Sequence, residues 1–456
     1  MAVTQDVGRK AINRLQSMYP LRALVDKTYE ATLRARKAGR PIVWSMLDAG
    51  YGSPFLNAME IESVYPENYG TVCAAAGSAA PFLERCEAEG FPTHLCGYAR
   101  NCLGYAARMV DLGEIPPEAP QGGMPKPVLL LASGAICDAR FKWFQALGRY
   151  LDVPVWTLEL PRPGARESLM EGAYERDVSF LVKELREFAT FLERLLGKKT
   201  DWDRFADDID RTMEMDAVWH EVNELRKARP CPMHSRDFWS SMSASIFRAE
   251  DPKAVTDLYR DMYDEVKCRV DNKTAGINRE EKYRLTFEGL PPWHSLRLFD
   301  QLAERGWNFV TEGYYHPPTP IDLSMVSDPI ERLVRYRYRG FAQLIESAFE
   351  VEEASKIKEE LRQRGFSNRL SVKHVKDHQC DGAFLHPLLT CRATTAPLSL
   401  LQRQLMEVWK VPSLVIEGDI VDTRLFDPVD ALRKAQAFEE TMEHYRRIRK
   451  DEGLEW

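Results

Sequence analysis

The stretch Pro127-Val-Leu-Leu-Leu-Ala-Ser133 is an apolar run that follows a linker rich in proline and glycine, residues 116–127. A short apolar run without polar alternation is typical of a strand that is buried on both faces of a parallel sheet. Residues 42–47 and 153–160 show the same pattern, and Pro161 closes the second of them. These runs predict a first parallel sheet that is covered by helices on both faces.

The sequence then changes character and later returns to the same pattern. Residues 171–196 and 201–228 are long and amphipathic, which predicts helices in a segment from 170 to 275. Strand-like runs follow at residues 282–289, 308–313, 382–386 and 412–419. The charge-rich residues 428–449 predict a final helix.

We therefore expect an α/β fold with two doubly wound, Rossmann-like lobes of parallel sheet. The predicted order is an N-terminal helical segment over 1–38, a first lobe over 39–169, the helical segment over 170–275 and a second lobe over 276–456. In doubly wound sheets, ligands bind beyond the carboxyl ends of the strands, so chemistry-bearing residues are sought there.

Composition narrows the class of protein. With 44% hydrophobic and 29% charged residues, the chain has the balance of a globular protein, and a net charge of −7 argues against a nucleic-acid partner. No apolar run approaches the length of a membrane span, and residues 1–10 lack the apolar core of a secretory signal. We expect a cytoplasmic protein without membrane contact, in which the nine cysteines stay reduced.

Cys96, Cys137 and Cys391 lie in or beside loops that adjoin apolar runs, and none belongs to a CxxC pair. Three thiolates brought together in this way could hold three irons of a 4Fe–4S cluster and leave the fourth iron open to chemistry. Position alone supports this only weakly, because buried structural cysteines are common. Cys102 and Cys380 are reserve candidates, since each lies near one of the three.

Several short motifs give the cysteines a context. They are Val64-Tyr-Pro-Glu-Asn-Tyr-Gly70, Cys96-Gly-Tyr-Ala-Arg100, Cys137-Asp-Ala139, Asp381-Gly-Ala-Phe-Leu-His386 with Cys391-Arg392, and Ile416-Glu-Gly-Asp-Ile-Val-Asp-Thr-Arg424. Through these motifs the chain resembles the 2-hydroxyacyl-CoA dehydratase and benzoyl-CoA reductase family of radical iron–sulfur enzymes. The resemblance implies a 4Fe–4S cluster held by Cys96, Cys137 and Cys391.

Within that family the chain is more similar to the larger catalytic subunit, the B-type subunit, of ATP-dependent benzoyl-CoA reductases. Aromatic-rich residues 229–239, 287–295 and 306–310 carry this likeness. It implies an oxidoreductase that converts an aryl-CoA into a cyclic dienoyl-CoA by single-electron steps. It also implies a smaller homologous subunit, ATPase subunits with their own iron–sulfur cluster, and reduced ferredoxin upstream. No phosphate-binding GxxxxGK[ST] motif occurs, so ATP hydrolysis would belong to another subunit.

Two alternatives remain open at this point. The first is a subunit of a 2-hydroxyacyl-CoA dehydratase, a radical lyase that would use the same three cysteines. The second is a non-catalytic subunit that holds a cluster and relays electrons. Leu388-Leu-Thr390, before the third cysteine, is more apolar than the resemblance leads us to expect.

The polar candidates for catalysis are His234, His294, Glu67 and Ser45. The two histidines are the predicted proton donors, because His234 lies near Trp239 and His294 follows Trp293. Each candidate has an ordinary alternative: a solvated or structural histidine, a capping carboxylate, or a strand-end hydroxyl. We interpret Glu417-Gly-Asp419 as a strand-end turn, because its spacing matches no oxygen-ligand metal motif.

Overall fold

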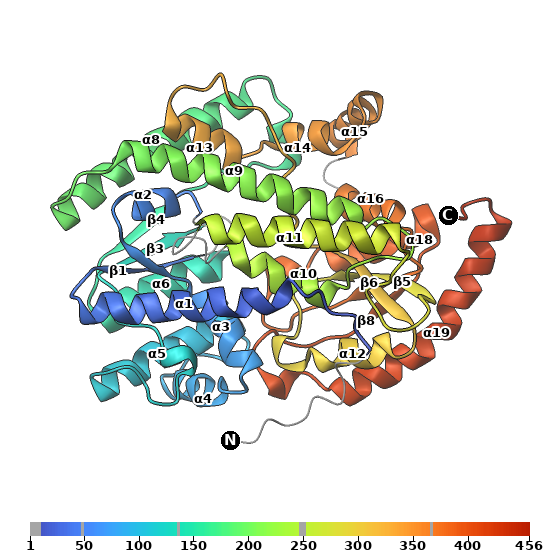
Figure 1. Cartoon of the computed structure of the whole chain (residues 1–456), viewed down its shortest axis with the longest axis horizontal. Coiled ribbons are helices and arrows are strands. Elements are labelled where there is room, and N and C mark those ends of the chain that lie inside the picture. Colours follow the sequence, from blue (N-terminus) through green and yellow to red (C-terminus); the bar gives the residue numbers. More distant parts are fainter. Residues whose placement is uncertain (1–10, 47–49, 135–136, 246–251, 365–367) are drawn as a thin grey trace.

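The computed structural model of the chain describes residues 11–46, 50–134, 137–245, 252–364 and 368–456. These residues form two four-stranded parallel sheets flanked by helices (Figure 1), which confirms the predicted α/β fold with two Rossmann-like lobes. The boundaries given for the four segments stay predictions. Among the residues described, no helix is both long enough and apolar enough to cross a membrane.

The first lobe contains the sheet that the apolar runs predicted. Its strands are β1 (Ile42–Ser45), β2 (Glu62–Val64), β3 (Leu129–Ser133) and β4 (Val155–Leu158), in the order β2-β1-β3-β4. Every residue of β1 and β3 is buried, which is why both read as unbroken apolar runs. The edge strand β2 was not predicted, because its three residues carry no apolar run.

Helices lie between and after the strands of the first lobe in the sequence. They are α2 (Ser53–Ala58), α3 (Pro66–Ala75), α4 (Ala80–Ala88), α5 (Gly97–Leu112), α6 (Asp138–Leu151) and α7 (Ala165–Ser168), with a short 3-10 turn at Pro120–Gly122. Helix α6 packs directly on β3 and β4, and α5 packs on α3, α4 and α6. The first turns of α5 and α6 therefore belong to neighbouring parts of one helical layer.

The second lobe repeats the topology of the first. Its strands are β5 (Tyr283–Glu288), β6 (Trp307–Glu312), β7 (Gly382–Leu385) and β8 (Ser413–Val415), in the order β6-β5-β7-β8. In each lobe the second strand pairs with one edge of the first strand, and the third strand pairs with its other edge. The reversal falls between β1 and β3 and between β5 and β7, and such switch points are where open α/β sheets bind ligands.

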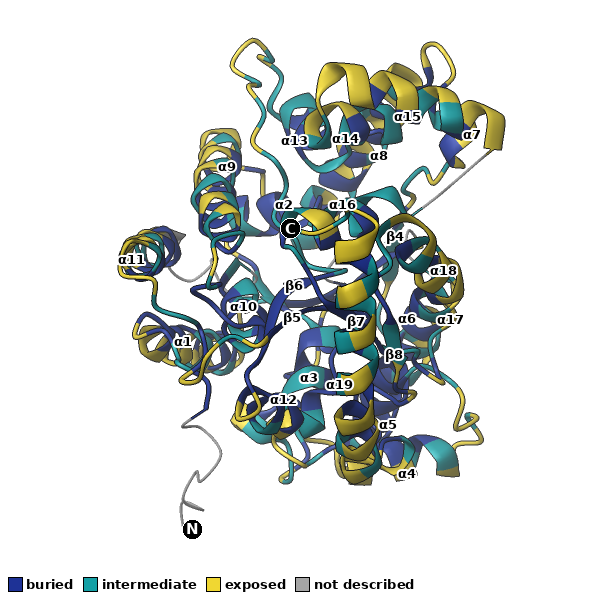
Figure 2. Cartoon of the chain, turned by 90° about the vertical axis from the view of Figure 1, so that its right-hand side faces the viewer, coloured by how far each residue is buried: buried dark blue, intermediate teal, exposed yellow. Residues whose placement is uncertain are grey.

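Helices also lie between and after the strands of the second lobe in the sequence. They are α12 (Arg297–Ala303), α13 (Pro329–Arg337), α14 (Phe341–Ala348), α15 (Val351–Arg364), α16 (Arg369–Asp377), α17 (Arg392–Thr395), α18 (Leu398–Trp409) and α19 (Pro428–Asp451), with 3-10 turns at Trp293–Ser295 and Thr423–Leu425. The predicted C-terminal helix corresponds to α19. Figure 2 shows α19 in front of β7 and β8, with its exposed side turned to solvent.

A third group of helices bridges the lobes. It comprises α1 (Met18–Lys37), α8 (Ala173–Leu196), α9 (Trp202–Leu225), α10 (Ser235–Ser241), a 3-10 turn at Met242–Ser245 and α11 (Pro252–Asp271). Helix α9 packs on α2 of the first lobe and on α13 of the second. Within the described residues the N-terminal helix begins only at Met18, later than the sequence predicted, and residues 1–10 lie outside the described part.

One hydrophobic core runs through both lobes. It includes Trp44 and Leu130 of the first sheet and Phe287 and Phe384 of the second. Figure 2 shows the buried strands at the centre and the exposed surface on the outer helices. Because the core is continuous, loops at the carboxyl ends of the two sheets are held in a fixed relation to one another.

Candidate functional site

Each of the three predicted cysteines stands at the start of a helix. Cys96 is the N-cap residue of α5, Cys137 that of α6 and Cys391 that of α17. All three are partly buried and none forms a disulfide. The first backbone N–H groups of a helix point toward its N-terminus and carry partial positive charge, so this position favours a thiolate or another anion.

The surroundings of two of the thiols place Cys391 near each of them. Burial raises the pKa of Cys96 to about 12, and repulsion from Cys391 adds to the rise. The N–H groups of Ala99 and Tyr98 lower the pKa and so oppose it. Burial also raises the pKa of Cys137, which the N–H of Arg140 opposes and the charge of Cys391 reinforces. Cys391 therefore lies within electrostatic reach of both other thiols. Without a cation between them, Cys96 and Cys137 would be protonated at neutral pH.

An ion pair joins the loops of Cys137 and Cys391. Asp138 and Arg392, the residues that directly follow these two cysteines, lie 2.6 Å apart from Oδ2 to the guanidinium nitrogen. Asp138 belongs to the first lobe and Arg392 to the second. The pair therefore shows that the two switch points face each other across the boundary between the lobes.

Asp419 joins the loops of Cys96 and Cys391. One of its carboxylate oxygens accepts hydrogen bonds from the N–H groups of Val421 and Asp422, each at 2.8 Å, and the other accepts from the Thr390 hydroxyl. A Cβ on Gly97 would come within 2.4 Å of Asp419 Oδ1. The strand-end turn predicted at Glu417–Asp419 is thus also a link between two cysteine loops, which sequence reasoning did not find.

The donor set suits an iron–sulfur cluster better than one metal ion. Among the described residues, no three cysteine, histidine, aspartate or glutamate side chains meet closely enough to bind a single ion. Thiolates of a cluster each bind a different iron, so they surround the group instead of converging on one point. Three partly buried thiols at helix N-termini on facing loops fit that requirement.

The reserve cysteines lie elsewhere. Cys102 is fully buried inside α5, and Cys380 is fully buried just before β7, at the opposite end of that strand from Cys391.

Glu67 and Tyr98 border the thiols on the side of the first lobe. Glu67, in the first turn of α3, pairs with Arg140 of α6, and its charge raises the pKa of Cys137. The hydroxyl of Tyr98 accepts a 2.6 Å hydrogen bond from Trp293 Nε1 and lies 3.0 Å from Thr71 Oγ1. The structure thus brings the predicted Glu67 to the cysteines.

His294 borders the site on the side of the second lobe. Its Nε2 lies 3.0 Å from the carbonyl oxygen of Asp419, and its Nδ1 lies 2.7 Å from Ser295 Oγ. Burial lowers its pKa, so the ring is neutral at pH 7. Through Asp419 this histidine adjoins the loops of Cys96 and Cys391.

Ser45 and His234 are held differently. Ser45 ends β1, is fully buried, and lies 3.3 Å from the carbonyl oxygen of Met46. His234 is fully buried between Phe299 and Phe309, and its Nδ1 accepts from the N–H of Arg236.

The position of His234 relative to the sheet separates it from the cysteines. The neighbouring Ser235 bonds to the carbonyl of Phe309, and Cys231 bonds through its carbonyl to Asn308, near the start of β6. Cys391, in contrast, follows the end of β7. The structure therefore does not bring His234 to the thiols.

The aromatic residues that suggested a ring pocket are mostly packed in the core. Trp239 and Trp293 are 3% and 5% exposed, and their rings contact each other edge to face. Trp239 also packs on Phe287 and Phe299. The aromatic richness of these loops is explained by core packing, and the expectation that they form the wall of a ring-binding pocket gains no support.

Two tyrosines after β6 were not predicted from sequence. Burial raises the pKa of Tyr314 to about 12, with added repulsion from Glu288 and Cys391. Tyr315 has a φ of 73°, a left-handed value that is uncommon for a residue with a side chain, and it lies in electrostatic reach of Tyr98 and Glu67. Such backbone strain concentrates at functional sites, but a sequence carries no signal for it.

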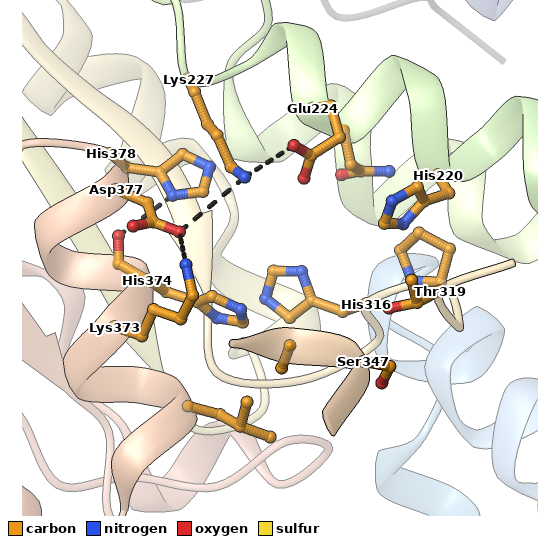
Figure 3. A pocket seen from close by; sticks show the side chains of 14 residues that line it. His220, Glu224, Lys227, His316, Thr319, Ser347, Lys373, His374, Asp377 and His378 are labelled. Carbon is orange, nitrogen blue, oxygen red and sulfur yellow. Dashed lines mark hydrogen bonds and ion pairs between the residues drawn. The ribbon is translucent and has the colours of Figure 1, made fainter. Parts of the chain in front are cut away.

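A polar pocket of about 270 Å³ lies beyond the same loop. Figure 3 shows its histidines, which are His220, His316, His374 and His378. The rings of His316 and His374 lie 4.4 Å apart, and burial lowers the pKa of His374 well below its usual value. Lys227 pairs with Glu224 and Lys373 pairs with Asp377, so the positive charges at this pocket are balanced.

Comparison with known proteins places this geometry in a family. The sequence profile of "2-hydroxyglutaryl-CoA dehydratase, D-component" matches residues 53–442. The (R)-phenyllactyl-CoA dehydratase alpha subunit of Clostridium sporogenes is 23% identical over 435 residues, which cover 95% of this chain and 97% of the relative. The (R)-2-hydroxyisocaproyl-CoA dehydratase alpha subunit of Clostridioides difficile is 24% identical, with 94% and 97% covered.

A benzoyl-CoA reductase subunit is similar to this chain at nearly the same identity. The B-type subunit of the benzoyl-CoA reductase of Thauera aromatica is 23% identical over 441 residues, with 92% of this chain and 93% of the relative covered. These relatives are enzyme subunits, and those of the dehydratases match over slightly more of the chain. The profile match spans most of the sequence, and the chain therefore belongs to the 2-hydroxyglutaryl-CoA dehydratase D-component family.

Proposed function

We propose that the chain is the cluster-bearing subunit of a 2-hydroxyacyl-CoA dehydratase, a lyase that removes water from a 2-hydroxyacyl thioester to give a 2-enoyl thioester. The observation that supports the proposal is the position of Cys96, Cys137 and Cys391 at three helix N-termini, with Cys391 in electrostatic reach of each of the other two. Dehydratase subunits among the relatives favour this reaction over ring reduction. The aromatic loops favoured a reductase over a dehydratase, whereas the relatives favour a dehydratase over a reductase.

The three thiolates would hold a 4Fe–4S cluster. Such a group supplies a single electron at low potential, and an iron without a cysteine ligand can polarise a thioester carbonyl. The chain's own contribution is to fix the thiolates through Asp419 and through the Asp138–Arg392 pair. Because metal binding requires deprotonated thiols, loading the site would release the protons that burial keeps on Cys96 and Cys137.

Neighbouring side chains would handle protons and exclude water. Loss of water from the substrate needs a base for a proton at C3 and an acid for the departing 2-hydroxyl. His294 and Glu67 stand on opposite sides of the thiols and remain the candidates for these roles. The buried pair of Tyr98 and Trp293, joined by a hydrogen bond between the two lobes, would help to keep bulk water from a radical intermediate.

The proposed enzyme is heteromeric. The relatives carry the names of single subunits, which supports partner subunits for this chain. The proposed partners are those that the family resemblance implies: a smaller homologous subunit, ATPase subunits with their own cluster, and reduced ferredoxin as the upstream donor. The test is product analysis with the complex purified without oxygen. A 2-hydroxyacyl-CoA should lose water with no net consumption of reductant, and failure of this reaction with every 2-hydroxyacyl-CoA tried would overturn the proposal.

An aryl-CoA reductase is the second candidate. The benzoyl-CoA reductase of Thauera aromatica, whose subunit matches at comparable identity, is the observation that favours it. The same preparation would then convert benzoyl-CoA to a cyclic dienoyl-CoA and consume reductant in proportion to product. A cluster-bearing relay subunit without substrate would show neither reaction and would bind no acyl-CoA.

A further inference from the structure

A second cavity, of about 380 Å³, lies between the two lobes. Arg162, which follows β4 of the first lobe, forms one part of its wall. Glu288, the last residue of β5, and Tyr314, just after β6, form another part. The cavity therefore lies at the carboxyl edge of the second sheet, and its volume is within the range of roughly 300–1,000 Å³ that is usual for small-molecule sites.

Tyr314 connects this cavity to the proposed cluster site. It lines the cavity, and burial raises its pKa, with smaller contributions from the charges of Glu288 and Cys391. Pro397 and Leu398, which begin α18, also line the cavity and lie only a few residues beyond Cys391. A molecule in the cavity would therefore reach the side of the second lobe on which Cys391 lies.

The side walls of the cavity are apolar. Phe341 and Leu344 come from α14, and Leu398 and Leu401 come from α18. Side chains of this kind favour an apolar guest, because both surfaces then leave water. Phe349, beyond the end of α14, adds an aromatic surface.

Glu288 is the buried polar group of this wall. It is 3% exposed, and its Oε1 accepts a 2.8 Å hydrogen bond from Thr286 Oγ1. Its Oε2 lies 3.4 Å from Ser371 Oγ and against Gly313, where a Cβ would come within 2.1 Å. The carboxyl group is thus fixed in place by contacts on both of its oxygens.

Positive charge lies nearer to solvent. Arg162 is exposed, and Arg369 is partly exposed and paired with Glu360 of α15. An exposed arginine at the cavity suits the anionic portion of coenzyme A, whereas the apolar walls suit the acyl group. The two ends of an acyl-CoA thus match the two parts of the cavity.

We propose that this cavity binds the acyl group of the thioester substrate, and that Glu288 restricts the enzyme to acyl groups without a terminal carboxylate. The inference rests on the proposed function and names its substrate class: 2-hydroxyacyl thioesters with an uncharged, apolar side chain, aromatic or branched. A terminal carboxylate would lose its hydration among apolar side chains, and it would find no partner in Glu288, whose two oxygens are already engaged by Thr286 and Ser371; burial of such an unpaired charge is strongly unfavourable.

The test measures binding to the complete heteromeric complex, kept without ATP and reductant so that bound thioesters are not converted. Three 2-hydroxyacyl-CoA thioesters serve as probes in calorimetry, with a methyl, a phenylmethyl and a carboxyethyl side chain. In the wild-type complex the phenylmethyl thioester should bind at least about tenfold more tightly than the carboxyethyl thioester. Equal affinity for these two would overturn the role of Glu288.

Variants then locate the site. Leu344→Trp would fill the cavity from α14 and should raise the ratio of methyl to phenylmethyl affinity by at least about tenfold. Leu344→Phe fills it less and should change the ratio in the same direction if the larger variant fails to assemble. Glu288→Gln should tighten binding of the carboxyethyl thioester. An unchanged ratio in both Leu344 variants would overturn the cavity assignment.

Ser347→Trp is the matched control. Ser347 lies on the same helix α14 but lines the histidine-rich pocket of Figure 3, so the same new side chain there should leave the ratio unchanged. If the wild-type complex binds and dehydrates a 2-hydroxyacyl-CoA but the Leu344 variants behave like wild type, only this inference fails. If the wild-type complex binds none of the thioesters, both the proposed function and this inference fail.

Discussion

Asp419 lies directly against Gly97, so that a Cβ on this glycine would come within 2.4 Å of Asp419 Oδ1. Gly97 is the first residue of α5 and follows Cys96. Asp419 in turn accepts a hydrogen bond from Thr390, which precedes Cys391. One buried carboxylate therefore contacts the loops of two of the three thiols, and a side chain at 97 would clash with it.

The first prediction follows from this contact. Gly97→Ala should displace Asp419 or the start of α5, at a cost of about 1–3 kcal/mol in the free energy of unfolding, as is usual for overpacking. Iron content per chain should fall, because Cys96 moves with the helix. Iron analysis and urea unfolding measure the two effects. Gly134→Ala is the control, since a Cβ there meets no atom within 4 Å, and wild-type iron and stability in Gly97→Ala would contradict the prediction.

The second prediction concerns the thiols themselves. Cys96→Ala, Cys137→Ala and Cys391→Ala should each lose most of the iron and acid-labile sulfide of the anaerobically purified complex, because each thiolate anchors a separate iron. Cys73→Ala and Cys86→Ala, both fully buried in the first lobe, should keep their iron and lose roughly 0.5–3 kcal/mol of stability. A complete cluster in Cys137→Ala would remove that residue from the ligand set.

Much of the fold could be predicted because its strands are buried on both faces. The runs at 127–133 and 382–386 correspond to β3 and β7, and the cysteines beyond them lie near the predicted switch points. The edge strand β2 was missed because Glu62 and Ser63 are only half buried and carry no apolar pattern. Sequence patterns report burial along one segment, so they find core strands more readily than edges.

The sequence selects candidate ligands for the site more readily than it predicts their surroundings. Motif resemblance selected Cys96, Cys137 and Cys391, and Cys391 lies in electrostatic reach of each of the other two. Contacts between their loops, such as the exposed pair of Asp138 with Arg392, join residues from different lobes, and one sequence holds no record of such contacts. His234 lies between Phe299 and Phe309 in the core, and an aromatic neighbour in the sequence does not distinguish a core from a pocket.

The third prediction uses a buried ion pair between the lobes. Arg100 of α5 is fully buried and lies 2.9 Å from Asp422 Oδ2, beyond β8. Asp422→Ala should cost about 3–5 kcal/mol of unfolding free energy, because it leaves the arginine charge buried without this partner. Asp111→Ala, which breaks an exposed pair with Arg85, is the control and should cost at most about 1 kcal/mol. Similar losses in both variants would contradict the prediction.

The same pair makes a pH-dependent contribution. Burial alone would raise the pKa of Asp422, but hydrogen bonds from Arg424 and Arg100 lower it from 3.8 to about 2. A carboxylate with a lowered pKa in the folded state stabilises the protein above its unfolded pKa and loses that contribution as the pH falls. Wild type should therefore lose stability relative to Asp422→Asn between about pH 4 and pH 2, measured as the urea midpoint at each pH.

The fourth prediction separates the two histidines. His294→Gln should slow turnover by roughly 10²–10⁴-fold if this ring transfers a proton, with iron content unchanged. His234→Gln should act on stability instead, because that ring is buried between Phe299 and Phe309. His220→Gln, in the pocket of Figure 3, is the control. Turnover at the wild-type rate in His294→Gln would leave Glu67 as the remaining candidate.

The last prediction concerns Glu288. Burial raises its pKa from 4.5 to about 7, although hydrogen bonds from Thr286 and Ser371 lower the pKa in part. Between these two pH values the folded protein binds a proton that the unfolded chain has released. Stability is therefore greatest below about pH 4.5 and falls as the pH rises to about 7, by roughly 2–3 kcal/mol between pH 5 and pH 8. Glu288→Gln cannot ionise, so its stability relative to wild type should increase by that amount over the same interval. Urea unfolding of both proteins at the two pH values measures the difference, and Glu359→Gln on the exposed face of α15 is the control. An equal loss of stability in wild type and Glu288→Gln would contradict the prediction. It would show that this carboxyl is ionised at neutral pH in the folded protein. The ionised carboxylate would then repel a substrate carboxylate through a full negative charge.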